Sequence, residues 1–93
     1  MARFDCAIWK PVVNHGGHMA AQHGLLLHHA VADGSLYGLF NSPASGVSAH
    51  FWVAQSDGRI EQYVDSEVVA WHAMQMNDTY CGVETEGCTG PPR

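Results

Sequence analysis

The chain has 93 residues, of which 46% are hydrophobic and 14% charged, with a net charge of -5 when histidine is neutral. Three Trp, three Tyr and three Phe supply large core side chains, which excludes a disordered chain and indicates one small domain or part of one. Only four Lys and Arg residues are present, so the chain lacks the positively charged surface that binds phosphate backbones. We therefore expect no nucleic-acid partner. No apolar stretch is long enough for a membrane span.

The N-terminus and the cysteines indicate where the chain is made. Residues 1–5 lack the apolar region of a signal peptide, so we expect cytoplasmic synthesis without an export signal. The three cysteines are Cys6, Cys81 and Cys88, and an odd number argues against a secreted disulfide framework. Cys81 and Cys88 could pair, but the cytosol favours reduced, buried thiols.

The first third of the chain leads into one apolar strand. Residues 1–24 are expected to be irregular, with turns favoured by Pro11 and the glycine pair 16–17. Three histidines in this segment match no closed zinc site, and we interpret them as part of a polar loop framing a cleft: His15, His18 and His23. The apolar run 25–30 is bounded by glycines and predicts a buried strand that holds His28 where it emerges into the cleft.

The rest of the chain alternates short strands with turns. Asp33 or Ser35 could cap a short helix over 36–40, which ends at Pro43. Residues 47–54 predict a second strand, 56–59 a hairpin turn and 59–64 the returning strand. Residues 65–72 are interpreted as a turn or one helical turn that delivers Trp71 and His72 to the sheet edge, and 77–79 as a further turn. Residues 80–87 alternate as a strand, and 89–93 form a loop.

These elements predict the α/β (mixed α+β) class, with a small central mixed β-sheet and flanking helices. We interpret residues 1–93 as a single partial domain. It consists of an irregular segment 1–24, a sheet core 25–88 and a tail 89–93. The apolar strands look buried on both faces, and such sheets are usually covered by helices. The chain offers few residues for those helices, so we expect a covering partner chain or a C-terminal truncation.

Four features could converge in a zinc hydrolase: His28, His50, the Trp71-His72 pair and Glu84. Such an enzyme needs protein ligands that leave one position open, and a carboxylate that takes a proton from water and later gives it to the leaving nitrogen. Glu84 fits that role if it points into the cleft beside His28. The alternative is a solvated strand face shared with Glu86, and any single histidine could instead be a surface residue or a core residue with satisfied hydrogen bonds.

Five motifs follow one another along the chain: LLLHHA at 25–30, VSAHFWV at 47–53, SDGRIEQYV at 56–64, AWHA at 70–73 and NDTYCGVETEG at 77–87. Together, in this order, they resemble the type 2 N-acetylmuramoyl-L-alanine amidases, a family that includes phage lysins and peptidoglycan recognition proteins. Trp9-Lys10-Pro11 and residues 36–41 are similar to actinobacteriophage endolysin amidase domains in particular.

The resemblance implies a role for individual residues. His28 matches the first zinc ligand and Glu84 the general acid/base, whereas His29, Trp71 and His72 match positions lining the groove for the muramyl peptide. The implied reaction is hydrolysis of the amide between the lactyl group of N-acetylmuramic acid and L-alanine, with zinc as cofactor and peptidoglycan as partner. An endolysin of this type acts on the host cell wall.

The chain also departs from the family. The other two zinc ligands, a His and an Asp or Cys, come in the family from beyond Gly87, so a C-terminal continuation or a partner chain is expected to supply them. Met74 stands where a glycine usually follows the Trp-His-Ala segment. An incomplete amidase is therefore one expectation, and a non-catalytic peptidoglycan-binding module or an inactive remnant is the alternative.

Overall fold

The structure is a computed structural model and describes residues 3–30 and 34–87. The expected cap at Asp33, the pairing of Cys81 with Cys88 and the tail 89–93 lie outside these residues. Within them, Cys81 is a buried free thiol whose Sγ–H donates to the carbonyl of Ser66 at 3.3 Å.

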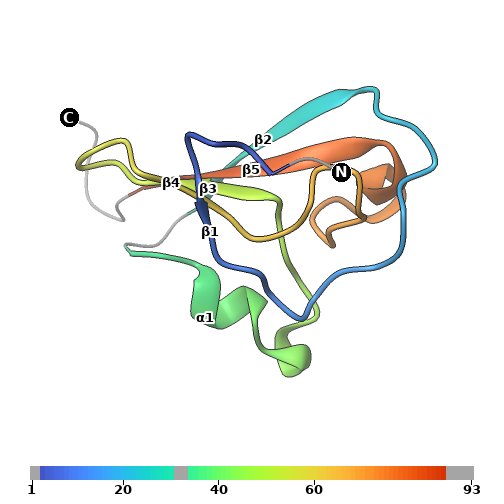
Figure 1. Cartoon of the computed structure of the whole chain (residues 1–93). Helices are drawn as coiled ribbons and strands as arrows, with labels where there is room; N and C mark the ends of the chain where they lie inside the picture. The colour runs from blue at the N-terminus through green and yellow to red at the C-terminus, as the bar shows by residue number, and fades with distance from the viewer. Residues whose placement is uncertain (1–2, 31–33, 88–93) are drawn as a thin grey trace.

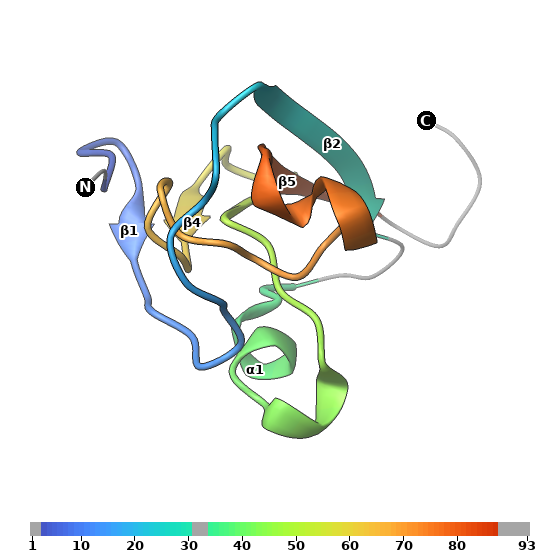
Figure 2. The same ribbon diagram turned by 90° about the vertical axis from the view of Figure 1, so that its right-hand side faces the viewer.

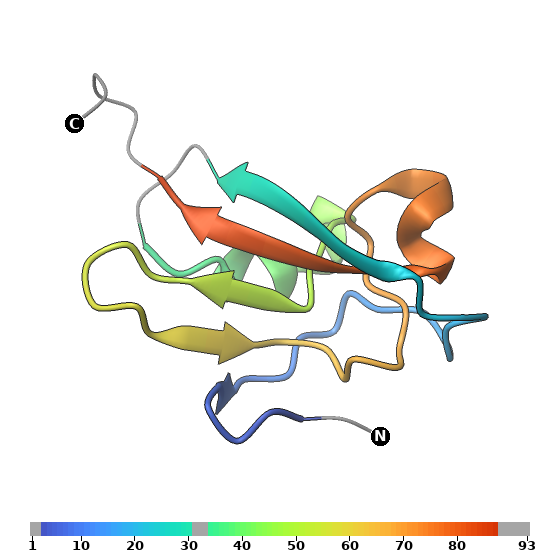
Figure 3. The ribbon, with the colours of Figure 1, turned by 90° about the horizontal axis from the view of Figure 1, so that it is seen from above.

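A five-stranded sheet in the order β1-β4-β3-β5-β2 forms the centre of the molecule. Its strands are β1 (Ile8–Trp9), β2 (Gly24–Ala30), β3 (Phe51–Val53), β4 (Ile60–Gln62) and β5 (Tyr80–Glu86). The β2–β5, β5–β3 and β1–β4 pairs are parallel and the β3–β4 pair is antiparallel, so the predicted mixed sheet is confirmed. Figure 3 shows β2 and β5 running together along one side of this sheet.

The longest ladder joins β2 to β5 in seven residue pairs, from Gly24 with Tyr80 to Ala30 with Glu86. The apolar run and the alternating residues of these segments favour extended backbone, as expected. However, β2 is an edge strand, and Leu25 and Leu27 are 62% and 74% exposed. The expectation of a strand buried on both faces is therefore wrong, because a local apolar run does not reveal its place in the sheet.

The hairpin β3–β4 forms at the predicted position. The Ala54 N–H donates to the Arg59 carbonyl at 2.8 Å, and Gly58 adopts a φ of +72° that suits glycine. Strand β1 lies within the segment that was expected to be irregular. It is held to β4 through its ladder and through a bond from the Lys10 N–H to the Gln62 carbonyl at 2.9 Å.

The helices are short and lie mainly on one side of the sheet. They are α1 (Tyr37–Phe40) and the 3₁₀ helices η1 (Pro43–Ser45) and η2 (Met74–Asp78), and α1 confirms the helix predicted for 36–40. Figures 1 and 2 show α1 on one side of the sheet, away from β2. None of the helices in the described ranges has the length and hydrophobicity to cross a bilayer. The core between α1 and the sheet consists of Val12, Phe40, Ala49, Trp52, Ala54, Tyr63, Val64 and Ala70.

Candidate active site

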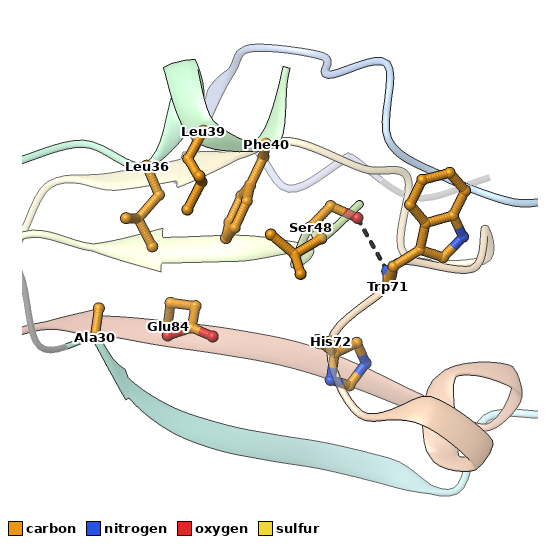
Figure 4. Close-up of a pocket in the computed structure, with 9 residues that line it drawn as sticks. Ala30, Leu36, Leu39, Phe40, Ser48, Trp71, His72 and Glu84 are labelled. Atoms are coloured by element: carbon orange, nitrogen blue, oxygen red, sulfur yellow. Dashed lines mark hydrogen bonds between the residues drawn. The ribbon is translucent and has the colours of Figure 1, made fainter. Parts of the chain in front are cut away.

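A groove of about 320 Å³ lies between α1 and strand β5. Figure 4 shows an apolar wall from the α1 segment facing Glu84 and His72, with Trp71 at one end. Its lining residues are Ala30, Leu36, Leu39, Phe40, Val47, Ser48, Trp71, His72 and Glu84. Glu84 is the only residue with a carboxylate, lysine or arginine side chain in this lining, so the groove combines an apolar wall with one negative group.

Strand register places Glu84 directly beside His28. The two residues are partners across the β2–β5 ladder, and Trp52 of β3 is the partner of Glu84 on its other side. Because partners in adjacent strands point to the same face, all three side chains lie on the face that carries the groove. The structure thus places the predicted metal ligand and the predicted acid/base residue next to each other, and both are half-buried.

The loop after β4 brings Trp71 and His72 into the groove, as expected. The Trp71 N–H donates to Ser48 Oγ at 3.0 Å, and the Ser48 N–H donates to the Trp71 carbonyl at 2.9 Å. Asn77 Oδ1 accepts the N–H groups of His72 and Ala73 at 2.9 and 2.7 Å. This segment is therefore held from both sides, although it has no regular secondary structure of its own.

The two histidines His28 and His72 are in contact. Nε2 of His28 lies 3.2 Å from Nδ1 of His72, and the two rings meet edge to face at 5.3 Å between centroids. Nε2 of His72 lies 2.9 Å from the Tyr80 carbonyl oxygen. Burial lowers the pKa of His72, which favours the neutral ring. His28 itself is not among the residues that line the groove, and it contacts the lining residue His72.

His50 does not join the site as a free imidazole. It is fully buried, its Nδ1 accepts the Gly82 N–H at 3.0 Å, and its Nε2 lies 2.6 Å from the Val68 carbonyl. Burial lowers its pKa to about 4, so the ring is neutral near pH 7. Both ring nitrogens are engaged with backbone, and the expected convergence of four features reduces to His28, the Trp71-His72 pair and Glu84.

The other histidines lie elsewhere. His29 alternates with His28 along β2 and faces the opposite side of the sheet, where its Nε2 approaches Gly87. Because His29 does not line this groove, its predicted contact with the substrate stays a prediction. His18 lies 3.4 Å from a Glu67 oxygen and His23 packs against Tyr80. Within residues 3–30 and 34–87, no group of three metal-binding side chains occurs.

Comparison with known proteins shows which family the chain belongs to. The family profile described as N-acetylmuramoyl-L-alanine amidase matches residues 12–93, which is most of the chain. The chain belongs to the N-acetylmuramoyl-L-alanine amidase family. This confirms the resemblance drawn from the five sequence motifs.

Three relatives illustrate how much of such an amidase the chain covers. N-acetylmuramoyl-L-alanine amidase A of Achromobacter lyticus is 35% identical over an alignment of 88 residues, which covers 90% of this chain and 49% of that protein. A crystal structure of an AmpD derivative matches with a TM-score of 0.77 and 24% identity, over 91% of this chain and 63% of that one. The endolysin amidase LysCS of Clostridium intestinale gives 0.71 and 18%, over 94% and 61%. The chain spans about half the length of the Achromobacter lyticus relative. The two solved structures have the same fold as this chain.

The amidase family implies zinc, and one residue of the described chain fits it. His28 makes its hydrogen bond through Nε2, and Nδ1 has no partner among the described residues, so that nitrogen is available as a ligand. Catalytic zinc sites use three protein ligands. The described residues offer one candidate for such a ligand, His28 beside Glu84, and no group of three metal-binding side chains.

Several residues that build this groove were not predicted from the sequence. Ser48 and Asn77 hold the Trp71-His72 segment, and Gly82 lets the His72 ring lie against β5, since a Cβ there would come within 2.6 Å of His72 Cγ. A glycine inside a strand pattern is a known signal of close approach, so Gly82 could have been found. Ser48 and Asn77 act over 23 and 5 residues, through contacts that no local pattern contains.

Proposed function

We propose that this chain supplies the substrate groove and the acid/base carboxylate of a zinc-dependent peptidoglycan amidase. The substrate bond is the amide between the lactyl group of N-acetylmuramic acid and L-alanine. The observation that carries the proposal is the position of Glu84, which lines the groove and is the register partner of His28 in a chain of this family. The same family match supports peptidoglycan as the partner.

Each of the chain's own residues has a defined task in this proposal. The apolar wall beside α1 binds the lactyl and alanyl methyl groups and excludes water, and Trp71 closes one end of the groove. Glu84 accepts a proton from the attacking water and delivers it to the leaving alanine nitrogen. Nδ1 of His28 would be one ligand of zinc, which when bound supplies positive charge for the amide carbonyl and acidifies water.

The proposal also covers the cellular setting. We place the synthesis of the chain in the cytoplasm and its action at the cell wall of a phage host, in the manner of an endolysin. LysCS, which has a related fold, is an endolysin. The further zinc ligands come, in this proposal, from outside the described residues, through a C-terminal continuation or a partner chain.

Peptide release from purified muropeptide tests the proposed reaction, with zinc and the C-terminal continuation or partner chain that supplies the further ligands both present. Glu84→Gln is expected to lower the rate at least about a hundredfold, because it removes the proton acceptor. Glu86→Gln is the matched control: Glu86 lies on the same strand and face, and its oxygens accept the N–H groups of Gly34 and Gln55. Peptide release by the unsubstituted protein, with an equal rate for Glu84→Gln, would refute the assignment.

A non-catalytic muropeptide-binding module is the second candidate. The observation that favours it is that the described residues line a groove yet include only one zinc ligand. Titration of zinc-free protein with muropeptide, followed by the fluorescence of Trp71 against a Trp71→Phe variant, distinguishes the two. Binding without zinc, together with no peptide release when zinc is present, would favour the binding module over the amidase.

A further inference from the structure

We propose that His72 is a positioning residue that fixes the ring of His28 in the Nε2–H tautomer and so presents Nδ1 as the metal-binding nitrogen. This differs from the substrate contact that the sequence suggested for His72. The proposal rests on the proposed function in one respect, since its purpose is metal binding at His28. The orientation of the two rings is inferred from the hydrogen bonds of His28 and His72 alone.

The tautomers follow from one carbonyl group. The Tyr80 carbonyl oxygen can only accept, so Nε2 of His72 must carry the hydrogen of their 2.9 Å bond. In the neutral ring, Nδ1 of His72 is then an acceptor. The 3.2 Å bond therefore requires a hydrogen on Nε2 of His28, and the lone pair of His28 is left on Nδ1.

The ring of His72 is itself held in place. It lies against the backbone of β5 at Gly82, where an added Cβ would stand 2.6 Å from Cγ and 2.7 Å from Nδ1 of His72. The backbone of His72 is tied to Asn77 Oδ1 at 2.9 Å, and the His50 ring packs at 6.0 Å between centroids. An acceptor fixed in this way can orient the ring of a neighbour.

The consequence for His28 is a single orientation before any metal binds. An imidazole free in water exchanges its hydrogen between two nitrogens and rotates, and a ligand held in one tautomer avoids that loss of freedom on binding. Metal-binding histidines are commonly oriented by a hydrogen bond at their other nitrogen, and removing such a partner typically costs about 10–100-fold in metal affinity. Here the partner is a second histidine rather than a carboxylate or a backbone carbonyl.

The first test uses the unsubstituted, metal-free chain. Nuclear magnetic resonance of isotope-labelled histidine nitrogens is expected to show Nε2–H tautomers for His28 and His72, and a scalar coupling across the bond from Nε2 of His28 to Nδ1 of His72. An Nδ1–H tautomer at His28, or no coupling in a folded chain, would overturn the proposal without any variant.

Two variants separate positioning from simple packing. The amide oxygen of His72→Asn can take the place of the Nδ1 acceptor, whereas the amide of His72→Gln reaches the place of Nε2 and leaves His28 without a partner. We expect the Nε2–H proton of His28 to stay protected from solvent exchange in His72→Asn and to be lost to exchange in His72→Gln. The same loss in both variants, with both folded, would mean that His72 acts only by filling space.

Titration with Zn²⁺ alone then reads out the function of the pair. In the unsubstituted chain, zinc is expected to shift Nδ1 of His28 and leave its Nε2–H in place. His72→Gln should bind zinc at His28 at least about tenfold more weakly and through both nitrogens, with His72→Asn close to the unsubstituted chain. Zinc binding at Nε2 of the unsubstituted chain, or equal binding by both variants, would contradict the proposal.

These measurements require no turnover, so they can succeed even if the amidase proposal fails. In the converse case, Glu84→Gln could abolish peptide release while the His28–His72 coupling is absent. That combination would retain the proposed reaction and reject the positioning role of His72.

Discussion

The two faces of the sheet are built from alternate residues of the same strands, yet they differ in kind. The groove face carries Leu26, His28, Trp52, Glu61, Gly82 and Glu84, and the back face carries Leu25, Leu27, Phe51, Val53, Ile60, Cys81 and Val83. On the groove face, Ser35 and Tyr63 donate to the buried Glu61 at 2.5 and 2.7 Å, whereas the buried Nε1 of Trp52 has no hydrogen-bond partner among the described residues. The back face is mainly apolar, although it also carries His29, Gln62 and Thr85. Phe4 and Cys6 line a hollow of about 220 Å³ there.

The difference shows which part of an amidase domain this chain provides. Parallel strands are normally covered on both faces. Here α1 and the loops around it cover the groove face, and along β2 the back face keeps two strongly exposed leucines. The described residues thus specify the chemistry-bearing face in detail, while the back face is only partly covered by the N-terminal segment.

The largest predicted effect concerns pH and the groove face. Burial gives His50 a folded pKa of about 4, below its ordinary value of 6.5, so the unfolded chain binds more protons between these values. The stability that depends on neutral His50 is therefore fully present above about pH 6.5. The free energy of unfolding falls by up to about 3 kcal/mol as the pH approaches 4. His72, whose pKa burial also lowers, acts in the same direction. Urea unfolding at a series of pH values measures this slope.

His50→Gln is the control for that slope. The glutamine amide can still donate to the Val68 carbonyl but cannot take up a proton, so its stability should depend less on pH over this range. An unchanged slope in His50→Gln would assign the pH dependence to other groups.

Gly82→Ala is expected to have the next largest effect. The new Cβ would lie 2.6–2.9 Å from three atoms of the His72 ring, so the ring or the strand must move. Overpacking of this kind costs about 1–3 kcal/mol. The free energy of unfolding in urea measures it, and Gly17→Ala is a suitable comparison because no atom lies within 4 Å of a Cβ placed there. Equal stabilities would show that His72 does not rest on β5.

Met74→Gly should raise stability. Met74 has a φ of +53°, the left-handed region that favours glycine, and its side chain is 85% exposed. The substitution removes strain and little packing, for an expected gain of about 1 kcal/mol by thermal unfolding. Met76 lies in the same 3₁₀ helix without a positive φ, so Met76→Gly should lower stability. Opposite signs for the two variants are the expected result, and a loss in both would contradict it.

The sequence predicted the individual strands and helices better than the contacts between them. Strands β2 and β5 and the hairpin follow from local patterns, namely an apolar run, alternation and Asp57-Gly58, and α1 follows in the same way. Strand β1 has only two residues and is defined by pairing with β4, which local periodicity does not contain. The contact between His28 and His72 spans 44 residues and depends on Gly82, so sequence reasoning placed both residues at the site but assigned His72 only a substrate contact.

The smallest expected effect on stability belongs to the back face. Leu27 is 74% exposed on the edge strand β2, so Leu27→Lys should change the free energy of unfolding by no more than about 0.5 kcal/mol. An edge strand with apolar side chains is a site for pairing between chains, and a charge there opposes it. Light scattering at rising protein concentration should therefore show less self-association for Leu27→Lys than for the unsubstituted chain.

Leu26→Lys is the matched control, because Leu26 precedes Leu27 on the same strand but is half-buried on the groove face. A lysine there must bring its charge toward packed side chains, so Leu26→Lys should lower stability more than Leu27→Lys. If Leu27→Lys is equally destabilising, the leucine must be covered in solution. Dilution then identifies the cover: a loss of stability that disappears in dilute protein comes from a second copy of the chain, since an intramolecular contact does not depend on concentration.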